Sequence, residues 1–88
     1  MMNPLIEKIF GIRPRDAARL VCRLAPREIE ALELIVVGAD RGTIAQCMGI
    51  AINTVGVYRN LLKKKLNCPR SDGLGRIYYA ARCAEFFP

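Results

Sequence analysis

The chain has 88 residues, of which 52% are hydrophobic and 25% charged, and its formal net charge is +6. This length has room for one small domain with a modest core, and the composition excludes a disordered chain. The charge is uneven: residues 1–44 carry seven basic and six acidic side chains, whereas residues 45–88 carry seven basic and two acidic ones. A basic excess concentrated in one half indicates a polyanionic partner, although many solvated surfaces are also basic.

Four cysteines and the lack of histidine limit the chemistry that the sequence can support. The cysteines are too widely spaced for a zinc knuckle, so we expect no metal site and no cofactor, and we interpret them as small apolar residues in a reducing cytoplasm. We expect no enzymatic activity, because the sequence shows neither clustered carboxylates nor a nucleophile beside a base. No signal peptide is visible, and no apolar run approaches the length that spans a membrane.

Helix signals dominate the chain, and the expected fold class is all-α. A short helix over 4–10 is followed by a second over 14–24, where a proline suits the first turn and apolar residues recur on one face. Pro26 begins the next helix, which is expected to extend to Val37 and to stop at Gly38.

The centre of the sequence has the pattern of a helix-turn-helix. Asp40 is expected to cap a short helix over 41–48, Gly49 to end it, and a longer helix to follow over 52–66. In such a motif the first helix braces the second, which enters the major groove of DNA. A last helix is expected over 71–86. The residues expected in the core of the central helices are Ile44, Ala45, Val55, Leu62 and Leu66.

Spaced residues of this region resemble the DNA-binding domain of LuxR/NarL-type (GerE-like) bacterial transcription regulators. The matching segments align without gaps: Leu24–Glu28, Gly38, Thr43–Ala45, Ile50–Tyr58 and Lys65–Leu66. The resemblance implies a four-helix, helix-turn-helix domain over 24–88 with a dimerising last helix, preceded by a helical extension over 1–23. It also implies a standalone, nucleoid-associated regulator in the cytoplasm. The similar helix-turn-helix of sigma-factor region 4 is the alternative.

Eight residues of the helix over 52–66 are predicted to contact DNA. In the first turn, a hydroxyl and backbone N–H groups can bind a phosphate, with local capping as the alternative role of that hydroxyl. Further along, an asparagine can pair with adenine, a valine can touch a thymine methyl, and an arginine can bind guanine or phosphate. The tyrosine hydroxyl and the lysines can contact phosphates, although a lysine run can also be a solvated face. The set is Thr54, Val57, Tyr58, Arg59, Asn60, Lys63, Lys64 and Lys65.

The same helix departs from the family pattern. Gly56 stands where the family usually has lysine, Tyr58 where it has histidine, and Ala51 where it has a capping serine. The glycine and the missing cap each cost a helix about 1 kcal/mol. Leu61 places an apolar side chain at a position that we expect to be largely exposed. These changes predict altered specificity, weaker binding, or a surface used for protein.

The last helix is apolar around most of its circumference and needs cover on more than one side. We predict that one side meets a second copy in a homodimer on a pseudo-palindromic site; the alternative is deeper burial in its own domain. The predicted seam is Leu74, Ile77, Tyr78 and Ala81. The leading hypothesis is therefore a dimeric regulator that binds double-stranded DNA. The alternative function is a protein-binding module that contacts another regulator or RNA polymerase through Leu61 and the last helix.

Overall fold

The computed structural model describes residues 11–70 and 73–86, and all regular structure within these ranges is helical. The helices are α2 (Pro14–Cys22), α3 (Pro26–Val36), α4 (Arg41–Met48), α5 (Ile52–Lys65) and α6 (Gly73–Phe86). Their ends lie within two residues of those expected from the sequence, which confirms the all-α fold class. The short helix expected over 4–10 lies outside the described residues.

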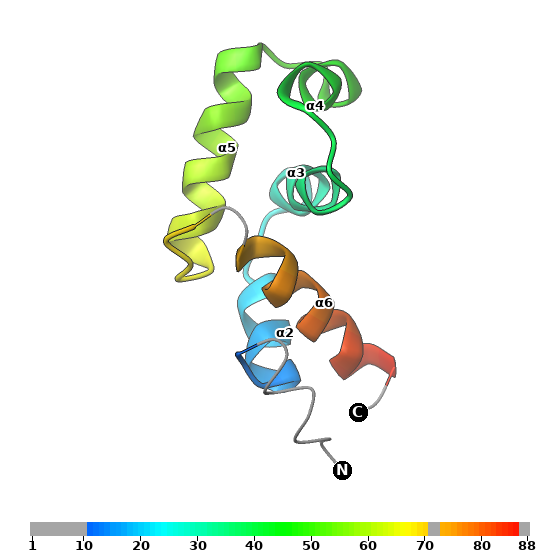
Figure 1. Cartoon of the computed structure of the whole chain (residues 1–88), viewed down its shortest axis with the longest axis vertical. Coiled ribbons are helices and arrows are strands. Elements are labelled where there is room, and N and C mark those ends of the chain that lie inside the picture. Colours follow the sequence, from blue (N-terminus) through cyan, green and yellow to red (C-terminus); the bar gives the residue numbers. More distant parts are fainter. Residues whose placement is uncertain (1–10, 71–72, 87–88) are drawn as a thin grey trace.

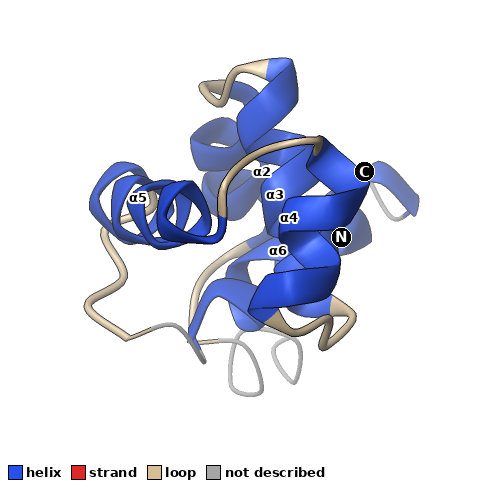
Figure 2. Cartoon of the chain, turned by 90° about the horizontal axis from the view of Figure 1, so that it is seen from above, coloured by secondary structure: helices blue, strands red, loops and turns tan. Residues whose placement is uncertain are grey.

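The molecule is elongated, with dimensions of 43 × 21 × 19 Å. α4 and the start of α5 form one end, and α2 and α6 form the other (Figure 1). α3 lies between them and contacts α4, α5 and α6. Seen from above, α5 stands to one side of the other helices (Figure 2). This arrangement leaves one long face of α5 uncovered.

Apolar side chains from all five described helices form one core. The core residues expected from the central helices are confirmed, since each is at most 6% exposed. Ala17 of α2 is fully buried in the same cluster. The described part of the N-terminal extension therefore shares the core of the domain. None of the described helices combines the length and the hydropathy needed to cross a bilayer.

The helix-turn-helix is formed by α4, residues 49–51 and α5. The Oδ1 atom of Asp40 accepts a hydrogen bond from the backbone N–H of Thr43 at 2.8 Å, which caps α4 as expected and lowers the pKa of Asp40. Gly49 ends α4 in the left-handed conformation, with a φ of +67° that side chains rarely adopt. The backbone N–H of Ile50 then donates to the carbonyl of Ala45 at 3.0 Å, which fixes the turn.

α6 lies along α2, and this is the most extensive helix–helix contact among the described residues (Figure 1). Leu74, Ile77 and Ala81 are buried there, with at most 8% of each exposed. The Tyr78 hydroxyl donates a hydrogen bond to Glu33 of α3 at 3.0 Å. α2 and α3 of the same chain therefore cover much of the surface of these four residues, and the seam predicted from the sequence stays a prediction.

Two adjacent charged residues at the start of α3 hold the ends of both helices of the motif. Glu28 is 6% exposed; its Oε1 atom accepts from the backbone N–H of Ala25 at 2.7 Å, and Lys65 Nζ lies 3.0 and 2.9 Å from its two carboxylate oxygens. The hydrogen bond from Lys65 lowers the pKa of Glu28, as does the bond from Ala25. Arg27 donates to the carbonyl of Met48 at the end of α4, at 2.6 Å.

We predict that replacing Lys65 with methionine lowers the free energy of unfolding by about 1–2 kcal/mol at neutral pH. The buried carboxylate of Glu28 then loses its cation, but the effect is moderate because the Lys65 side chain is 40% exposed. The folded-state pKa of Glu28 is lowered, so the Glu28–Lys65 pair stabilises the fold at pH values above the ordinary glutamate pKa of about 4.3. This stabilisation is lost as the pH falls through the folded-state pKa of Glu28. Urea unfolding of the wild type and the variant, at neutral pH and in acid, measures the difference in the free energy of unfolding.

The matched control is Lys64→Met, which removes an exposed ammonium from the neighbouring position. It is expected to change stability by less than about 0.5 kcal/mol. A Lys65→Met effect that equals the control, or that persists undiminished in acid, would contradict the role assigned to the Glu28–Lys65 pair.

Candidate nucleic-acid interface

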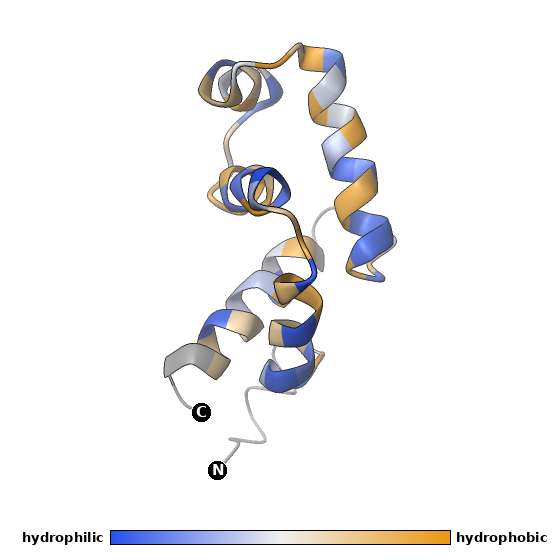
Figure 3. Cartoon of the chain, turned by 180° about the vertical axis from the view of Figure 1, so that it is seen from behind, coloured by the Kyte–Doolittle hydropathy of each residue, from blue (hydrophilic) through white to orange (hydrophobic). Residues whose placement is uncertain are grey.

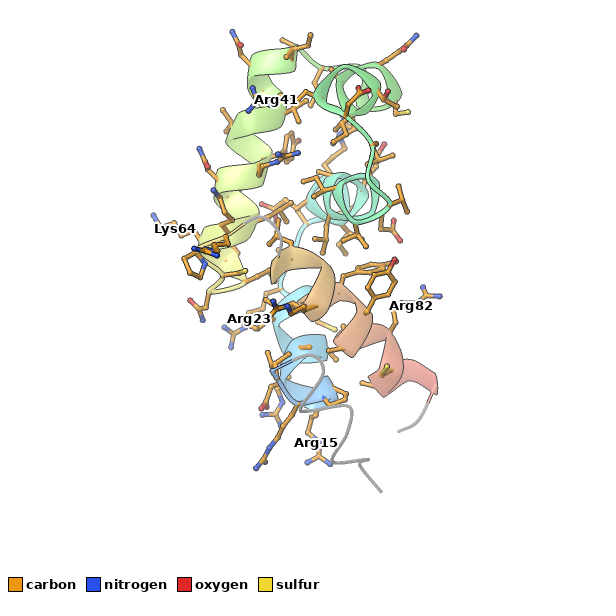
Figure 4. All side chains as sticks on the ribbon, viewed as in Figure 1. Arg15, Arg23, Arg41, Lys64 and Arg82 are labelled. Atoms are coloured by element: carbon orange, nitrogen blue, oxygen red, sulfur yellow. The ribbon has the colours of Figure 1, made fainter. Side chains whose placement is uncertain are left out.

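α5 turns one row of side chains toward solvent. Asn53, Val57, Asn60 and Lys64 follow one another at steps of four, three and four residues, which places them on one helix face. All four are exposed, and Val57 is exposed to 64%. The buried residues of α5, including Leu62, lie on the opposite face. We call these four residues the outward row; Figure 4 shows Lys64 projecting from the uncovered side of α5.

The N-terminal end of α5 is open to an external anion. Ala51 occupies the N-cap position and has no side chain that can cap the helix. The backbone N–H of Thr54 donates to the Ala51 carbonyl at 3.0 Å, which leaves the first two backbone N–H groups of the helix available. The positive end of the helix dipole favours a negative group there. The structure shows no capping bond from Thr54, which leaves its half-buried hydroxyl beside this end.

A shallow groove separates α5 from the start of α3. Its volume is about 370 Å³, and its walls are Thr54, Val57, Tyr58 and Leu61 on one side and Ala25, Arg27 and Glu28 on the other. Tyr58 is half-buried and packs against the core, so its ring forms a wall of the groove. Leu61 is also half-buried, which corrects the largely exposed position expected from the sequence.

Three of the predicted contact residues are held differently from the outward row. Arg59 is half-buried, and its Nε atom is buried without a hydrogen-bond partner in the described part of the chain. Lys63 is half-buried, and the Lys65 ammonium is held by Glu28. The exposed face expected from the sequence is thus narrower and is rotated away from Arg59 and Lys63. Lysines in the last turn also stabilise the helix dipole, so their charge alone does not identify a binding surface.

Asn53 belongs to the outward row but was not among the residues predicted from the sequence. Its spacing to Val57, Asn60 and Lys64 was a signal that could have identified it, because the four positions recur on one face at helical steps. In Figure 3 the last turn of α5 is hydrophilic, in agreement with the lysines there. The face therefore combines amide groups, one apolar side chain and a cation along a single exposed line.

Comparisons with known proteins agree with this geometry. The family described as "Bacterial regulatory proteins, luxR family" (GerE) matches residues 23–74, a range that contains α3, α4 and α5. The transcriptional regulatory protein MctR of Rhizobium johnstonii is 43% identical over 53 residues, which make up 60% of this chain and 25% of MctR. The aligned segment thus spans a quarter of that relative. No solved structure matches the chain significantly.

Gly56 lies within α5 and allows a test of whether the helix accepts a side chain at this position. A Cβ atom placed there meets no other atom within 4 Å, and the residue lies inside the helix. We predict that Gly56→Ala stabilises the protein by about 0.5–1 kcal/mol, because alanine loses less backbone entropy in a helix. Thermal unfolding measures the change.

The matched control is Gly49→Ala, which places a side chain on the left-handed residue that ends α4 and should destabilise the protein. If Gly56→Ala lowers the melting temperature as Gly49→Ala does, the description of α5 as a regular helix at this position is contradicted.

Proposed function

Because the chain belongs to the luxR family of bacterial regulatory proteins, we propose that it is a transcription regulator that binds double-stranded DNA through α5. The outward row is the observation that carries this proposal. A solvent-facing helix with side chains has a diameter of about 10–12 Å, which fits a major groove about 12 Å wide. Such a regulator acts on the bacterial nucleoid, in the cytoplasm.

The chemistry of the outward row suits the two kinds of DNA contact. Asn53 and Asn60 present amides, and an asparagine can form paired hydrogen bonds with adenine. Val57 can meet the methyl group of thymine. Lys64 lies near the end of α5, where a helix leaves the groove and passes the phosphates. We therefore propose base contacts in the middle of the row and a phosphate contact at its end.

The edge facing the groove supplies further proposed contacts. The open N-terminal end of α5 and the Thr54 hydroxyl are suited to one phosphate. Tyr58 lines the same edge, and its hydroxyl can donate to the DNA backbone. We keep Arg59 and Lys63 as secondary proposals, since both are half-buried, and we propose a scaffold role for Lys65 because its ammonium is held by Glu28.

The alternative is a protein-binding module that contacts a regulator or RNA polymerase. The exposed side chain of Val57 favours it, because a large apolar residue in an uncovered position can dock a protein as well as a base. Against it, Leu61 is half-buried, and α2 already covers apolar residues of α6. DNA binding is the better-supported proposal, and the experiment below separates the two.

We predict that the chain binds a generic DNA duplex with an affinity that falls steeply with salt, and that Lys64→Gln reduces the slope of log affinity against log salt by about 0.9. One fewer phosphate contact releases one fewer counterion. Fluorescence anisotropy over a series of salt concentrations measures the slope. Arg82→Gln is the charge-matched control, because Arg82 projects from the opposite side of the molecule (Figure 4).

Asn60→Ala provides a complementary variant. It is expected to leave the salt slope unchanged but to lower discrimination among sequences selected from a random pool, because an amide reads bases and does not neutralise phosphates. Failure of the wild-type chain to bind any duplex at low salt, together with a stoichiometric protein partner, would replace this proposal with the protein-binding alternative.

We also propose that two copies bind a pseudo-palindromic site as a homodimer, through a seam other than the one covered by α2. Tyr79 is a large apolar side chain of α6 that stays exposed, at 48%, and its ring lies edge-on to Tyr78 with 5.5 Å between centroids. We therefore expect Tyr79 to lie in the seam.

Tyr79→Glu is expected to weaken self-association at least about tenfold, because a carboxylate would have to be desolvated in the seam. Sedimentation equilibrium of both proteins measures the dimer dissociation constant, and circular dichroism verifies that the variant remains folded. A wild-type chain that stays monomeric up to about 100 μM would contradict the homodimer, since specific dimers usually form at lower concentrations.

A further inference from the structure

A basic row runs along α2 and its C-cap, and it begins outside the residues matched by the family, which start at Arg23. Arg15, Arg19 and Arg23 follow at steps of four residues, and all three side chains are exposed. The opposite side of this segment carries Ala17 and Leu24, which are buried. No ion pair or side-chain hydrogen bond joins the three arginines to another residue in the ranges 11–70 and 73–86.

The stability of α2 does not explain the whole row. Like charges four residues apart repel and destabilise a helix by about 0.2–0.5 kcal/mol for each pair. Arg15 also lies in the first turn, where the positive end of the helix dipole disfavours a cation. Arg19 in the last turn and Arg23 at the C-cap are favoured by the dipole, so the unfavourable terms are the repulsion along the row and the position of Arg15. An anionic partner along the row would offset both.

The row on α2 continues the basic end of α5. The Oε1 atom of Glu28 receives hydrogen bonds from both Lys65 Nζ, at 3.0 Å, and the backbone N–H of Ala25, at 2.7 Å. Ala25 is two residues from Arg23, so the end of α5 lies beside the end of α2. Figure 4 shows Lys64 and Arg23 projecting on the same side of the molecule, with Arg15 farther along α2.

We infer that Arg23, Arg19 and Arg15 form an extension of the DNA-binding surface that contacts the phosphates flanking the groove occupied by α5. This inference rests on the proposed function of α5 and adds a binding surface to it. Successive arginines advance about 6 Å along α2, so the row can track a phosphate backbone with cations on one side of the helix. Such contacts strengthen binding to every sequence without reading bases.

The test compares the full chain with Arg15→Gln, Arg19→Gln and Arg23→Gln, singly and combined, on a generic duplex of about 30 base pairs. The combined variant is expected to lower the salt slope by about two to three and to weaken binding at least about tenfold at low salt, whereas each single variant lowers the slope by up to about 0.9. Arg82→Gln serves as the control for the loss of one charge on the opposite side of the molecule. Selection from a random pool should return the same preferred bases for the wild-type and the combined variant.

The outcomes separate this inference from the function on which it rests. If the wild type binds DNA and Lys64→Gln lowers the slope while the combined arginine variant does not, the extension is overturned and the function of α5 stands. If each arginine variant changes the slope no more than Arg82→Gln, the effect is one of net charge, and the extension is again overturned. If the wild type binds no duplex at any salt concentration, the proposed function and the extension both fail.

Discussion

The position of α5 depends on two adjacent side chains at the start of α3. Glu28 receives the Lys65 ammonium from the end of α5, and Arg27 donates to the Met48 carbonyl at the end of α4. One turn of α3 therefore holds both helices of the helix-turn-helix. Hydrogen bonds that involve charged groups are stronger than neutral ones, and a buried carboxylate without its cation is costly. Rotation of α5 about its own axis would pull Lys65 away from Glu28 and would also expose the buried side chains of Val55 and Leu62.

This constraint gives neighbouring residues of α5 different roles. Successive side chains on a helix are turned by about 100°, so the three consecutive lysines cannot share one environment. Lys65 is held by the scaffold, Lys63 is half-buried, and Lys64 faces solvent with the other residues of the outward row. The same rotation turns Tyr58 toward the groove beside α3 and leaves Asn60 exposed. The fold thus selects a narrow surface from a segment in which many residues are chemically able to bind DNA.

The ends of the helices could be predicted from the sequence, whereas the exposed face of α5 and the packing partner of α6 could not. Asp40, Gly49 and the prolines act through local backbone chemistry, so the helix ends could be read within two residues. The buried residues of α5 set its approximate rotation, but the ion pair that holds Lys65 joins it to Glu28, 37 residues away in the chain. The element that packs on α6 could not be predicted from the sequence either, because the apolar residues of α6 suit a second copy as well as another helix of the same chain. In this structure, α2 of the same chain packs on α6 beside the residues predicted as the seam.

The central claim is that the outward row of α5 is the DNA-binding face. The most direct test is to follow the backbone amide resonances of the whole chain by nuclear magnetic resonance while a duplex is added. Binding through this face predicts that the largest changes occur at Asn53, Val57, Asn60 and Lys64 and that buried α6 residues such as Ala80 change little. Changes concentrated on α4 or α6, with the outward row unaffected, would contradict it.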